Sequence, residues 1–433
     1  MDKKDKRYDA YLRILNKELI PAMGCTEPIA IAYCAAVARD TLGTWPDRVE
    51  IYVSGNIIKN VKSVIVPNTG NKKGLEAAAA AGIVAGNAAR KLEVIAQVSV
   101  EQIEQMTRFL DDIPIRVMFA DTECPLDIEV ILYHGQDSAR VHIMQEHTNI
   151  VLIEKNGEIL VKAEPQNAPG TKGLPEASGQ DDDYGLLCME GIFDFAQTVA
   201  IEDVRQLLDQ QIEYNTAIAR EGLARDYGAN IGSVLLKAYG SDIRTRAKAA
   251  AAAGSDARMD GCELPVVINS GSGNQGMTVS LPVIEYAKET GAGQETLYRA
   301  LVLSNLAAIH QKFYIGRLSA YCGAVSAGAA AGAGITYLLG GGYSHICHTI
   351  VNALAITSGI VCDGAKPSCA AKIAASVDAG ILGYEMYRNG QQFYGGDGVL
   401  AKGIENTLRN IGRLGKDGMK DTDKEIIRIM SDC

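Results

Sequence analysis

The cysteines at 322, 362 and 369 are the residues whose chemistry this sequence indicates most clearly. Cys362-Asp-Gly-Ala-Lys-Pro-Ser-Cys369 separates two thiols by a short turn, and Pro367 is suited to begin the helix that follows. Cys369 would then lie in the first helical turn, where exposed N–H groups and the helix dipole stabilise a thiolate. Cys322 begins a Gly- and Ala-rich segment with room for a bulky inorganic group. Three thiolates without an obvious fourth favour an iron-sulfur cluster with one open iron over a closed zinc site, which takes four ligands.

The spacing of these cysteines leaves a second interpretation open. No Cys-x-x-Cys pair is present, and scattered cysteines are commonly small buried hydrophobes. His345, Cys347 and His348 also lie close together, but their spacing fits one helix face with buried or capping imidazoles, which is the interpretation we favour. Four further thiols have no partner pattern and are interpreted as core or surface residues: Cys34, Cys124, Cys188 and Cys262.

Cys25 lies beside the expected start of a helix. Thr26 is the predicted N-cap, Pro28 falls in the first turn, and the Ala-rich helix runs towards Leu42. A helix N-terminus lowers the pKa of a thiol, which would suit Cys25 to act as a base or a nucleophile. The alternative is a cysteine without a role, with Glu27 complementing the helix dipole.

A polar, glycine-rich loop, Asn269-Ser-Gly-Ser-Gly-Asn-Gln-Gly276, follows the apolar, strand-like run from Leu264 to Ile268. Backbone N–H groups in such a loop can bind a carboxylate or a phosphate, although an ordinary glycine turn would look the same. Two shorter polar turns, Ser54-Gly-Asn56 and Pro67-Asn-Thr-Gly70, lie at the ends of predicted strands.

The elements that must position these residues divide into helical and strand-rich parts. Leu12, Leu15 and Leu19 share one face of an amphipathic helix that ends at Pro21. Asn156-Gly157 predicts a two-residue hairpin turn. Beyond Gly185, long Ala- and Leu-rich periodic stretches predict helices. Apolar alternation or short apolar runs predict strands at Val49–Val53, Val64–Val66, Ile113–Phe119, Leu126–Tyr133 and Val141–Met144.

We therefore predict an α+β protein with two domains. A mostly helical cluster-binding domain would comprise residues 1–45 and 186–433. An α+β domain of residues 46–185 would be inserted into it and would end in an exposed linker at 165–183. Packing of the first two helices against the C-terminal half would bring Cys25 near the three cysteines at 322, 362 and 369.

The composition excludes several classes of protein. A formal net charge of -10 without a run of Lys and Arg gives no electrostatic footprint for nucleic acid. The charged N-terminus lacks the apolar core of a signal peptide, and the sparse cysteines indicate a reducing compartment, the cytoplasm. Residues 323–342 carry no charge over the length of a membrane span, but their Gly and Ala content predicts a tightly packed interior helix.

Taken together, these residues resemble the L-cysteine desulfidase family, which is related to the alpha-subunit domain of iron-sulfur L-serine dehydratases. The resemblance runs nearly end to end. Its most specific motifs are Pro21-Ala-Met-Gly-Cys-Thr-Glu-Pro28, Gly271-Ser-Gly-Asn-Gln-Gly276, Tyr321-Cys-Gly323 and Cys362-Asp-Gly-Ala-Lys-Pro-Ser-Cys369.

The resemblance implies a 4Fe-4S cluster bound by Cys322, Cys362 and Cys369, with the fourth iron reserved for substrate and no pyridoxal phosphate. L-cysteine and water would become pyruvate, ammonia and hydrogen sulfide, with Cys25 as the catalytic base. Serine dehydratases carry a different motif at this position, so Cys25 favours L-cysteine over L-serine. The partners that we expect are this small amino acid and a second copy of the chain in a homodimer, with no nucleic acid and no membrane.

Several residues are candidates for holding the substrate. Ser272, Asn274 and Gln275 would hold its carboxylate or amine, and Asn56 and Thr69 are further candidates. Lys366 would pair with the substrate carboxylate or with the charge of the cluster. The C-terminal Cys433 carries a thiol and a carboxylate, as L-cysteine does, so it either plugs the open iron or forms a free tail.

Three rival functions remain open from the sequence. The first is L-serine dehydratase activity with the same cluster. The second is a pyridoxal phosphate lyase, a class with similar glycine loops, although no Schiff-base lysine motif is present. The third is a non-catalytic iron-sulfur or zinc protein in which the three cysteines are structural.

Overall fold

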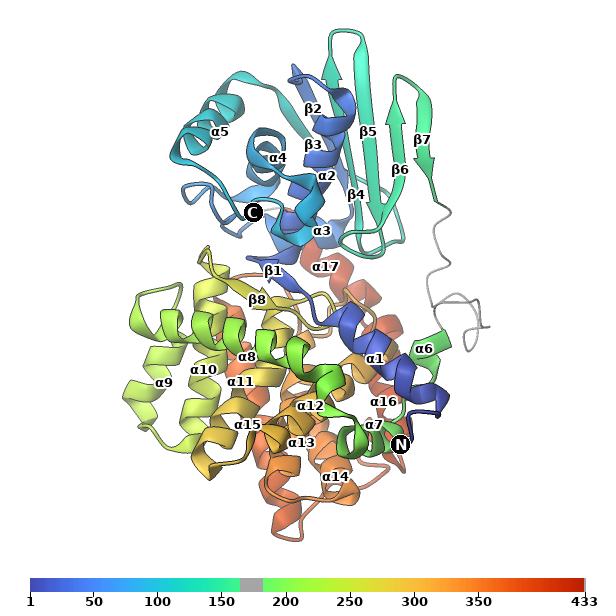
Figure 1. The fold of residues 1–433 in the computed structure, drawn as a ribbon, viewed down its shortest axis with the longest axis vertical. Coiled ribbons are helices and arrows are strands. Elements are labelled where there is room, and N and C mark those ends of the chain that lie inside the picture. Colours follow the sequence, from blue (N-terminus) through green and yellow to red (C-terminus); the bar gives the residue numbers. More distant parts are fainter. Residues whose placement is uncertain (164–181, 432–433) are drawn as a thin grey trace.

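The computed structural model describes residues 1–163 and 182–431. Figure 1 shows a sheet covered on one face by helices, and beside it a larger group of helices. The strands β1 and β8 and the C-terminal helix α17 lie where these two parts meet. The protein is therefore α+β, as the sequence predicts.

The sheet has six strands in the order β3-β2-β4-β5-β6-β7. β2 and β3 are parallel, and the other neighbouring strands are antiparallel. Val49, Ile51 and Val53 of β2 alternate with more exposed residues and are buried against the covering helices. The strands are β2 (Arg48–Val53), β3 (Ile115–Phe119), β4 (Asp127–His134), β5 (Asp137–Met144), β6 (Ile150–Lys155) and β7 (Glu158–Lys162).

The helices over the sheet form two layers. α2 packs on β4 and β5, and α4 packs on α2. This second contact is close, because a Cβ at Gly82 would lie 2.0 Å from the Ala32 carbonyl oxygen. The helices of this part are α2 (Thr26–Leu42), α3 (Gly55–Val61), α4 (Gly74–Ala85), η1 (Ala88–Glu93) and α5 (Val100–Asp112).

The second part is built from helices packed around α13, which is buried along most of its length. Its first members are α1 (Lys6–Glu18), α6 (Asp182–Gly185), α7 (Met189–Thr198), α8 (Ile201–Ala224), α9 (Ile231–Tyr239) and α10 (Ile243–Met259). They are followed by α11 (Gly273–Thr290), α12 (Gln294–Ile315), α13 (Gly323–Leu338), α14 (Tyr343–Thr357) and α15 (Ser368–Arg388). The chain continues with α16 (Ile404–Arg413), the π-turn η2 (Leu414–Gly418) and α17 (Lys420–Ser431).

Glycine allows the central helices to approach one another closely. A Cβ at Gly328 of α13 would lie 2.4 Å from the Ser376 carbonyl oxygen of α15, and one at Gly380 would lie 2.3 Å from that of Gly328. The charge-free stretch at 323–342 thus forms an interior helix, as predicted. In the residues that the structure describes, no helix combines the length and apolar character needed to cross a membrane.

Two short strands join the regions that carry the predicted site. β1 (Pro21–Met23) pairs antiparallel with β8 (Pro265–Val267), with Ala22 opposite Val266. β1 leads directly into Cys25, and β8 leads into the glycine-rich loop. This pairing therefore brings together two motifs that are about 240 positions apart in the sequence.

Most local predictions are confirmed, including the first helix, the hairpin at Asn156-Gly157 and four of the five strand regions. Val64–Val66 is not a strand; Ile65 forms only an isolated bridge with Lys73. The N-cap of α2 is Cys25 and not Thr26.

The expected packing of the first two helices against the C-terminal half holds for α1 and is wrong for α2, which packs on the sheet. The division of the chain into 1–45 with 186–433 and an inserted 46–185 stays a prediction. The linker predicted at 165–183 lies almost entirely outside the described residues.

Candidate functional site

Three of the candidate cysteines lie at helix N-termini. Cys25 is the N-cap of α2, Cys322 is the N-cap of α13, and Cys369 lies in the first turn of α15. The N-terminus of a helix presents unpaired N–H groups and the positive end of the helix dipole, both of which favour a negative sulfur ligand.

Cys362 is held next to Cys322 by the backbone. The Cys322 N–H donates to the Ile360 carbonyl at 3.3 Å, and the Cys362 N–H donates to the Ala320 carbonyl at 2.7 Å. Tyr321 and Val361 form the antiparallel bridge between these two bonds. Two cysteines that are 40 positions apart are therefore fixed on adjacent segments.

The cysteines at 322, 362 and 369 are close enough to influence one another electrostatically. Burial raises the pKa of Cys322 to about 12, and the thiols of Cys362 and Cys369 contribute to that increase. Burial also raises the pKa of Cys369, with a further contribution from Cys362. All three are free thiols; burial favours the protonated form of Cys322 and Cys369, and a bound cation would favour thiolates.

This donor set fits an iron-sulfur cluster better than a single metal ion. Within residues 1–163 and 182–431, no three His, Cys, Asp or Glu side chains are placed to hold one metal ion. Each cysteine of a 4Fe-4S cluster binds a different iron, so its sulfurs lie farther apart than the ligands of one ion. The three thiols match this requirement, because they are mutually close and form no disulfide; Cys322 is buried, and Cys362 and Cys369 are partly buried.

Cys25 lies beside this trio. It packs with Val64 and Met259, and Cys369 packs against the same group. The Cys25 Sγ donates to Glu27 Oε2 at 3.1 Å, and Glu27 also accepts from Thr26 Oγ1 at 3.1 Å and Asn60 Nδ2 at 3.1 Å. Glu27 is thus a buried carboxylate that receives three hydrogen bonds.

The predicted low pKa of Cys25 is wrong for the protein in this state. Burial raises the pKa of the Cys25 thiol well above its ordinary value, and the Glu27 carboxylate raises it further, while the Arg258 guanidinium lowers it. Burial outweighs the helix dipole because the thiol has lost its contact with water. Cys25 is therefore a neutral thiol that hydrogen-bonds to a carboxylate.

The glycine-rich loop lies against both groups. Ser272 is the N-cap of α11, and its side chain accepts a hydrogen bond from the Gln275 N–H. Asn274 Oδ1 accepts from Arg258 Nη1 at 3.2 Å. The Gln275 side chain packs on Gly323, where a Cβ would lie 2.7 Å from the Gln275 Cδ, so it lies next to Cys322. The Gln275 Oε1 is buried and has no hydrogen-bond partner.

Three substrate candidates remain, Thr69, Lys366 and Asn56. Thr69 Oγ1 donates to the Val66 carbonyl and accepts from the Lys72 N–H, so it stabilises its own turn. Lys366 forms an ion pair with Asp363 at 2.8 Å. Asn56 lies in the first turn of α3, and its Oδ1 is buried without a partner.

Two residues at the site were missed from the sequence. Arg258, at the end of α10, is 2% exposed, and its Nε has no hydrogen-bond partner in the part of the chain that the structure describes. His147, from the turn between β5 and β6, is 6% exposed with an unpartnered Nε2. A Cβ at Gly271 would lie 3.1 Å from the His147 Cε1. Neither residue belongs to a local motif, so only the tertiary structure reveals them.

Other conspicuous groups lie elsewhere. His345 and His348 stack on Tyr384 and Tyr387 of α15, which agrees with a packing role for this face of α14. Cys433 lies outside the described residues.

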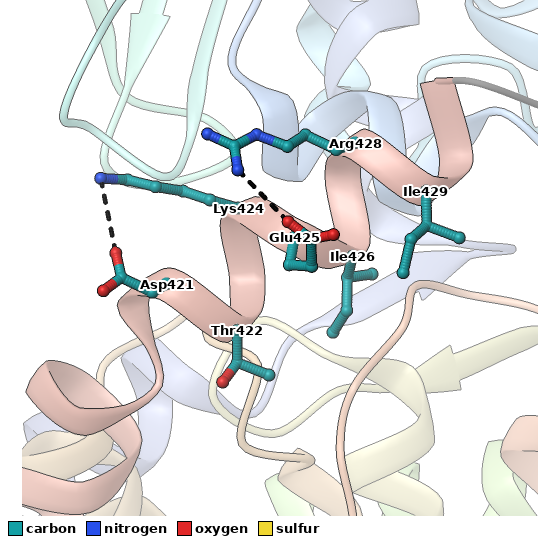
Figure 2. Close-up of a pocket in the computed structure, with 7 residues that line it drawn as sticks. All are labelled: Asp421, Thr422, Lys424, Glu425, Ile426, Arg428 and Ile429. Atoms are coloured by element: carbon teal, nitrogen blue, oxygen red, sulfur yellow. Dashed lines mark hydrogen bonds and ion pairs between the residues drawn. The ribbon is translucent and has the colours of Figure 1, made fainter.

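Figure 2 shows a pocket on α17 whose lining residues all come from that helix, with ion pairs Asp421–Lys424 and Glu425–Arg428. It includes none of the candidate residues, and the candidate functional site stays the group formed by Cys25 and the cysteine trio.

Comparison with known proteins shows the family of the chain. The model of the serine dehydratase alpha chain family matches residues 72–428. The chain belongs to this family. It is thus related to iron-sulfur-dependent dehydratases and is a lyase-type enzyme.

Members of the UPF0597 group are similar over nearly their whole length. A UPF0597 protein of Desulfitobacterium hafniense is 61% identical over 430 residues, which cover 99% of this chain and 98% of the relative. The UPF0597 protein of Lachnoclostridium phytofermentans is 52% identical, over 98% of this chain and 99% of the relative. That of Vibrio parahaemolyticus is 39% identical, over 99% of this chain and 100% of the relative. This serine dehydratase alpha chain family member is therefore also a UPF0597 protein.

Proposed function

We propose that this protein is an L-cysteine desulfidase, a carbon-sulfur lyase that does not use pyridoxal phosphate. L-cysteine would lose its α-proton and its β-sulfur, and the resulting aminoacrylate would tautomerise and react with water to give pyruvate and ammonia. The observation that carries the proposal is the position of Cys25, a buried thiol bonded to Glu27 and packed beside Cys369.

Cys322, Cys362 and Cys369 would hold a 4Fe-4S cluster. When bound, a cluster with one iron free of protein ligands supplies a Lewis acid that draws electrons from the substrate's carboxylate and leaving group. The protein contributes an enclosed site, since Cys25 and Cys322 are both buried. Exclusion of water strengthens each electrostatic interaction within the site.

Cys25 would take the α-proton as the general base. Its own proton is directed at Glu27 Oε2, so Glu27 can accept that proton and leave a thiolate. Thr26 Oγ1 donates both to Glu27 and to the Gly271 carbonyl, at 3.1 and 2.9 Å. This hydroxyl links the carboxylate to the glycine-rich loop and fixes its orientation.

Leaving-group chemistry distinguishes L-cysteine from L-serine. Hydrosulfide is a much weaker base than hydroxide, so it leaves without a protein acid to protonate it. In the described residues around Cys25 we find no histidine bonded to Cys25 or Glu27 that could serve as such an acid. This favours L-cysteine, while L-serine dehydration with the same cluster is the second candidate because the family model is named for serine dehydratases.

A comparison of the two substrates tests the proposal. The protein is purified and its cluster assembled without oxygen, and sulfide, ammonia and pyruvate are measured with L-cysteine and with L-serine. We expect equal amounts of the three products from L-cysteine and a kcat/KM for L-serine at least about 100-fold lower. A higher kcat/KM for L-serine would make the protein a dehydratase, and turnover that requires added pyridoxal phosphate would reject the proposal.

A further inference from the structure

Arg258 is a buried cation whose charge is not balanced by a carboxylate. Its side chain is 98% buried, and in the described part of the chain no Asp or Glu forms an ion pair with it. The side-chain hydrogen bond that it forms with the described residues is from Nη1 to the neutral Asn274 side chain. Leaving a charged group buried and unpaired costs several kcal/mol, so such a group in a native protein indicates a missing partner.

The other cations near the cysteine trio already have partners. Arg317 binds Glu18 and Glu146, and Lys59 binds Asp423. Lys366 and Lys372 both bind Asp363. Lys312 has no carboxylate, but its ammonium donates to the Arg317 carbonyl. Arg258 therefore stands apart, since its Nε has no hydrogen-bond partner among residues 1–163 and 182–431.

Arg258 also lies at the right place to meet the substrate. Its neighbour Met259 packs with Cys25, and Cys369 joins that group. Burial raises the pKa of both thiols, and the positive charge of Arg258 acts against that increase. Arg258 therefore adjoins a residue that packs with both the candidate base and one candidate cluster ligand.

The surrounding chain holds the guanidinium in a fixed position. A Cβ at Gly273 would lie 2.3 Å from the Arg258 Nε and 2.8 Å from its Cζ, so glycine is needed at this position. Asn274 then fixes Nη1 from the next residue of the same loop. A fixed, planar guanidinium suits a carboxylate, which it can bind through two parallel hydrogen bonds.

We propose that Arg258 binds the α-carboxylate of the amino-acid substrate. Asn274 would position the guanidinium and not contact the carboxylate itself, which revises the role expected for that residue. The buried, unpartnered Gln275 Oε1 would remain to accept a hydrogen bond from the α-ammonium group. The inference deepens the proposed function and rests on it for the identity of the substrate.

The test uses two non-reacting ligands that differ at the carboxylate. L-alanine keeps the carboxylate and lacks the thiol, whereas L-alaninamide has a neutral amide there. Both are titrated calorimetrically into the cluster-loaded wild type, Arg258→Gln, Arg258→Lys and the control Arg246→Gln. Arg246 lies on the same helix, but its guanidinium binds Glu289 and the Ser241 carbonyl.

We expect the wild type and the Arg246→Gln control to bind L-alanine about 100-fold more tightly than L-alaninamide. Arg258→Gln should lose this preference, and Arg258→Lys should keep part of it. With L-cysteine, Arg258→Gln should raise KM about 100-fold and lower kcat much less, because the interaction is made in the ground state as well.

Two results would overturn the proposal. One is an unchanged preference for L-alanine in Arg258→Gln. The other is that Arg258→Gln loses the cluster, whereas Arg258→Lys keeps both the cluster and the full wild-type preference for L-alanine over L-alaninamide. This would mean that Arg258 only balances the charge of the cluster. Failure of the proposed function is separate, since it would appear as no sulfide release by the wild type whatever the ligand preference.

Discussion

Glu27 is the residue on which the proposed chemistry of Cys25 depends most. It accepts the Cys25 Sγ–H, and burial together with its charge raises the pKa of that thiol. The thiol can act as a base only if its proton moves to a neighbouring acceptor, and Glu27 Oε2 is 3.1 Å away. The pair therefore resembles other nucleophile–base pairs, in which one side chain activates the next.

We predict that Glu27→Gln lowers kcat for L-cysteine by about 100-fold, because the amide cannot take the thiol proton. Glu101→Gln is a matched control, since Glu101 also lies in the first turn of a helix, far from the cysteines in the sequence. Steady-state kinetics of sulfide release measures both. Full activity of Glu27→Gln would show that Cys25 does not pass its proton to this carboxylate.

The cysteine trio gives a second prediction about single residues. Serine in place of Cys322, Cys362 or Cys369 should reduce the bound iron from about four atoms per chain to nearly none, because an open cluster has no fourth protein ligand to compensate. Cys124→Ser should keep its iron, since that thiol donates to the Leu126 carbonyl within its own turn. Iron and acid-labile sulfide analysis after anaerobic assembly gives the answer, and equal iron in all variants would refute the ligand assignment.

Sequence and structure agree best on residues whose signal is local. The sequence predicts Cys322 at the start of a glycine-rich helix and Cys369 in the first turn of a proline-initiated helix, and both helices form. Arg258 and His147 could not be predicted, because a single Arg or His has no pattern and their neighbours come from distant segments. The pKa of Cys25 was wrong for a similar reason: burial is a tertiary property, whereas the helix dipole is local.

At the scale of elements, close helix contacts decide where the site residues lie. α13 begins at Cys322 and α15 begins beside Cys369, so the separation of these helices helps to fix the separation of the two thiols. The two helices approach closely at Gly328 and Gly380. A Cβ added at Gly328 would lie 2.4 Å from the Ser376 carbonyl oxygen, and one added at Gly380 would lie 2.3 Å from the Gly328 carbonyl oxygen.

We predict that Gly380→Ala destabilises the protein by about 2 kcal/mol or more, because α13 and α15 must separate to admit the methyl group. Gly342→Ala is the control, since it lies between α13 and α14 with nothing within 4 Å of its would-be Cβ. Thermal unfolding of both variants measures the difference. An equal melting temperature for the two would contradict the packing described for these helices.

The predictions that were wrong for whole elements concern which neighbouring element a helix or strand packs against or pairs with. The amphipathic pattern of the first helix predicted α1, yet nothing in the Ala-rich pattern of α2 indicates whether its small residues face a helix or a sheet. In the structure they face both β4 and β5 and the close-packed α4. Val64 and Val66 are buried without a strand partner, because apolar spacing reports burial and not hydrogen bonding.

For the whole molecule, the C-terminal helix joins the two parts of the fold. Lys59 of α3 binds Asp423 of α17 at 2.5 Å and also donates to the Cys362 carbonyl at 3.4 Å. A Cβ at Gly55 would lie 2.6 Å from the Ile427 Cδ1, so α17 packs directly on α3. The segment that carries Cys362 is therefore supported from the sheet side as well as by its own helices.

Stability of the whole molecule should depend on pH through Asp256, which is fully buried and accepts the Gly232 N–H at 3.1 Å. Burial raises its pKa from 3.8 to about 6. Between these values the folded protein holds a proton that the unfolded chain releases, so stability falls as pH rises through this window. The loss is about 3 kcal/mol, the product of the shift and 1.36 kcal/mol per pKa unit.

Asp256→Asn should remove this contribution, because the amide does not ionise. Urea unfolding midpoints of the variant and the wild type, measured at intervals from pH 4 to 7.5, should diverge up to about pH 6 and then stay parallel. A difference that does not change with pH would mean that Asp256 titrates normally.

Sulfide release by the wild type and by Cys25→Ala, each with its cluster assembled anaerobically, tests the central claim most directly. The wild type should convert L-cysteine to sulfide, pyruvate and ammonia in equal amounts. Cys25→Ala should keep its iron and its visible absorbance while losing about 10³-fold in kcat, the contribution typical of a general base. Full turnover by Cys25→Ala, or no sulfide from the iron-loaded wild type, would contradict the account.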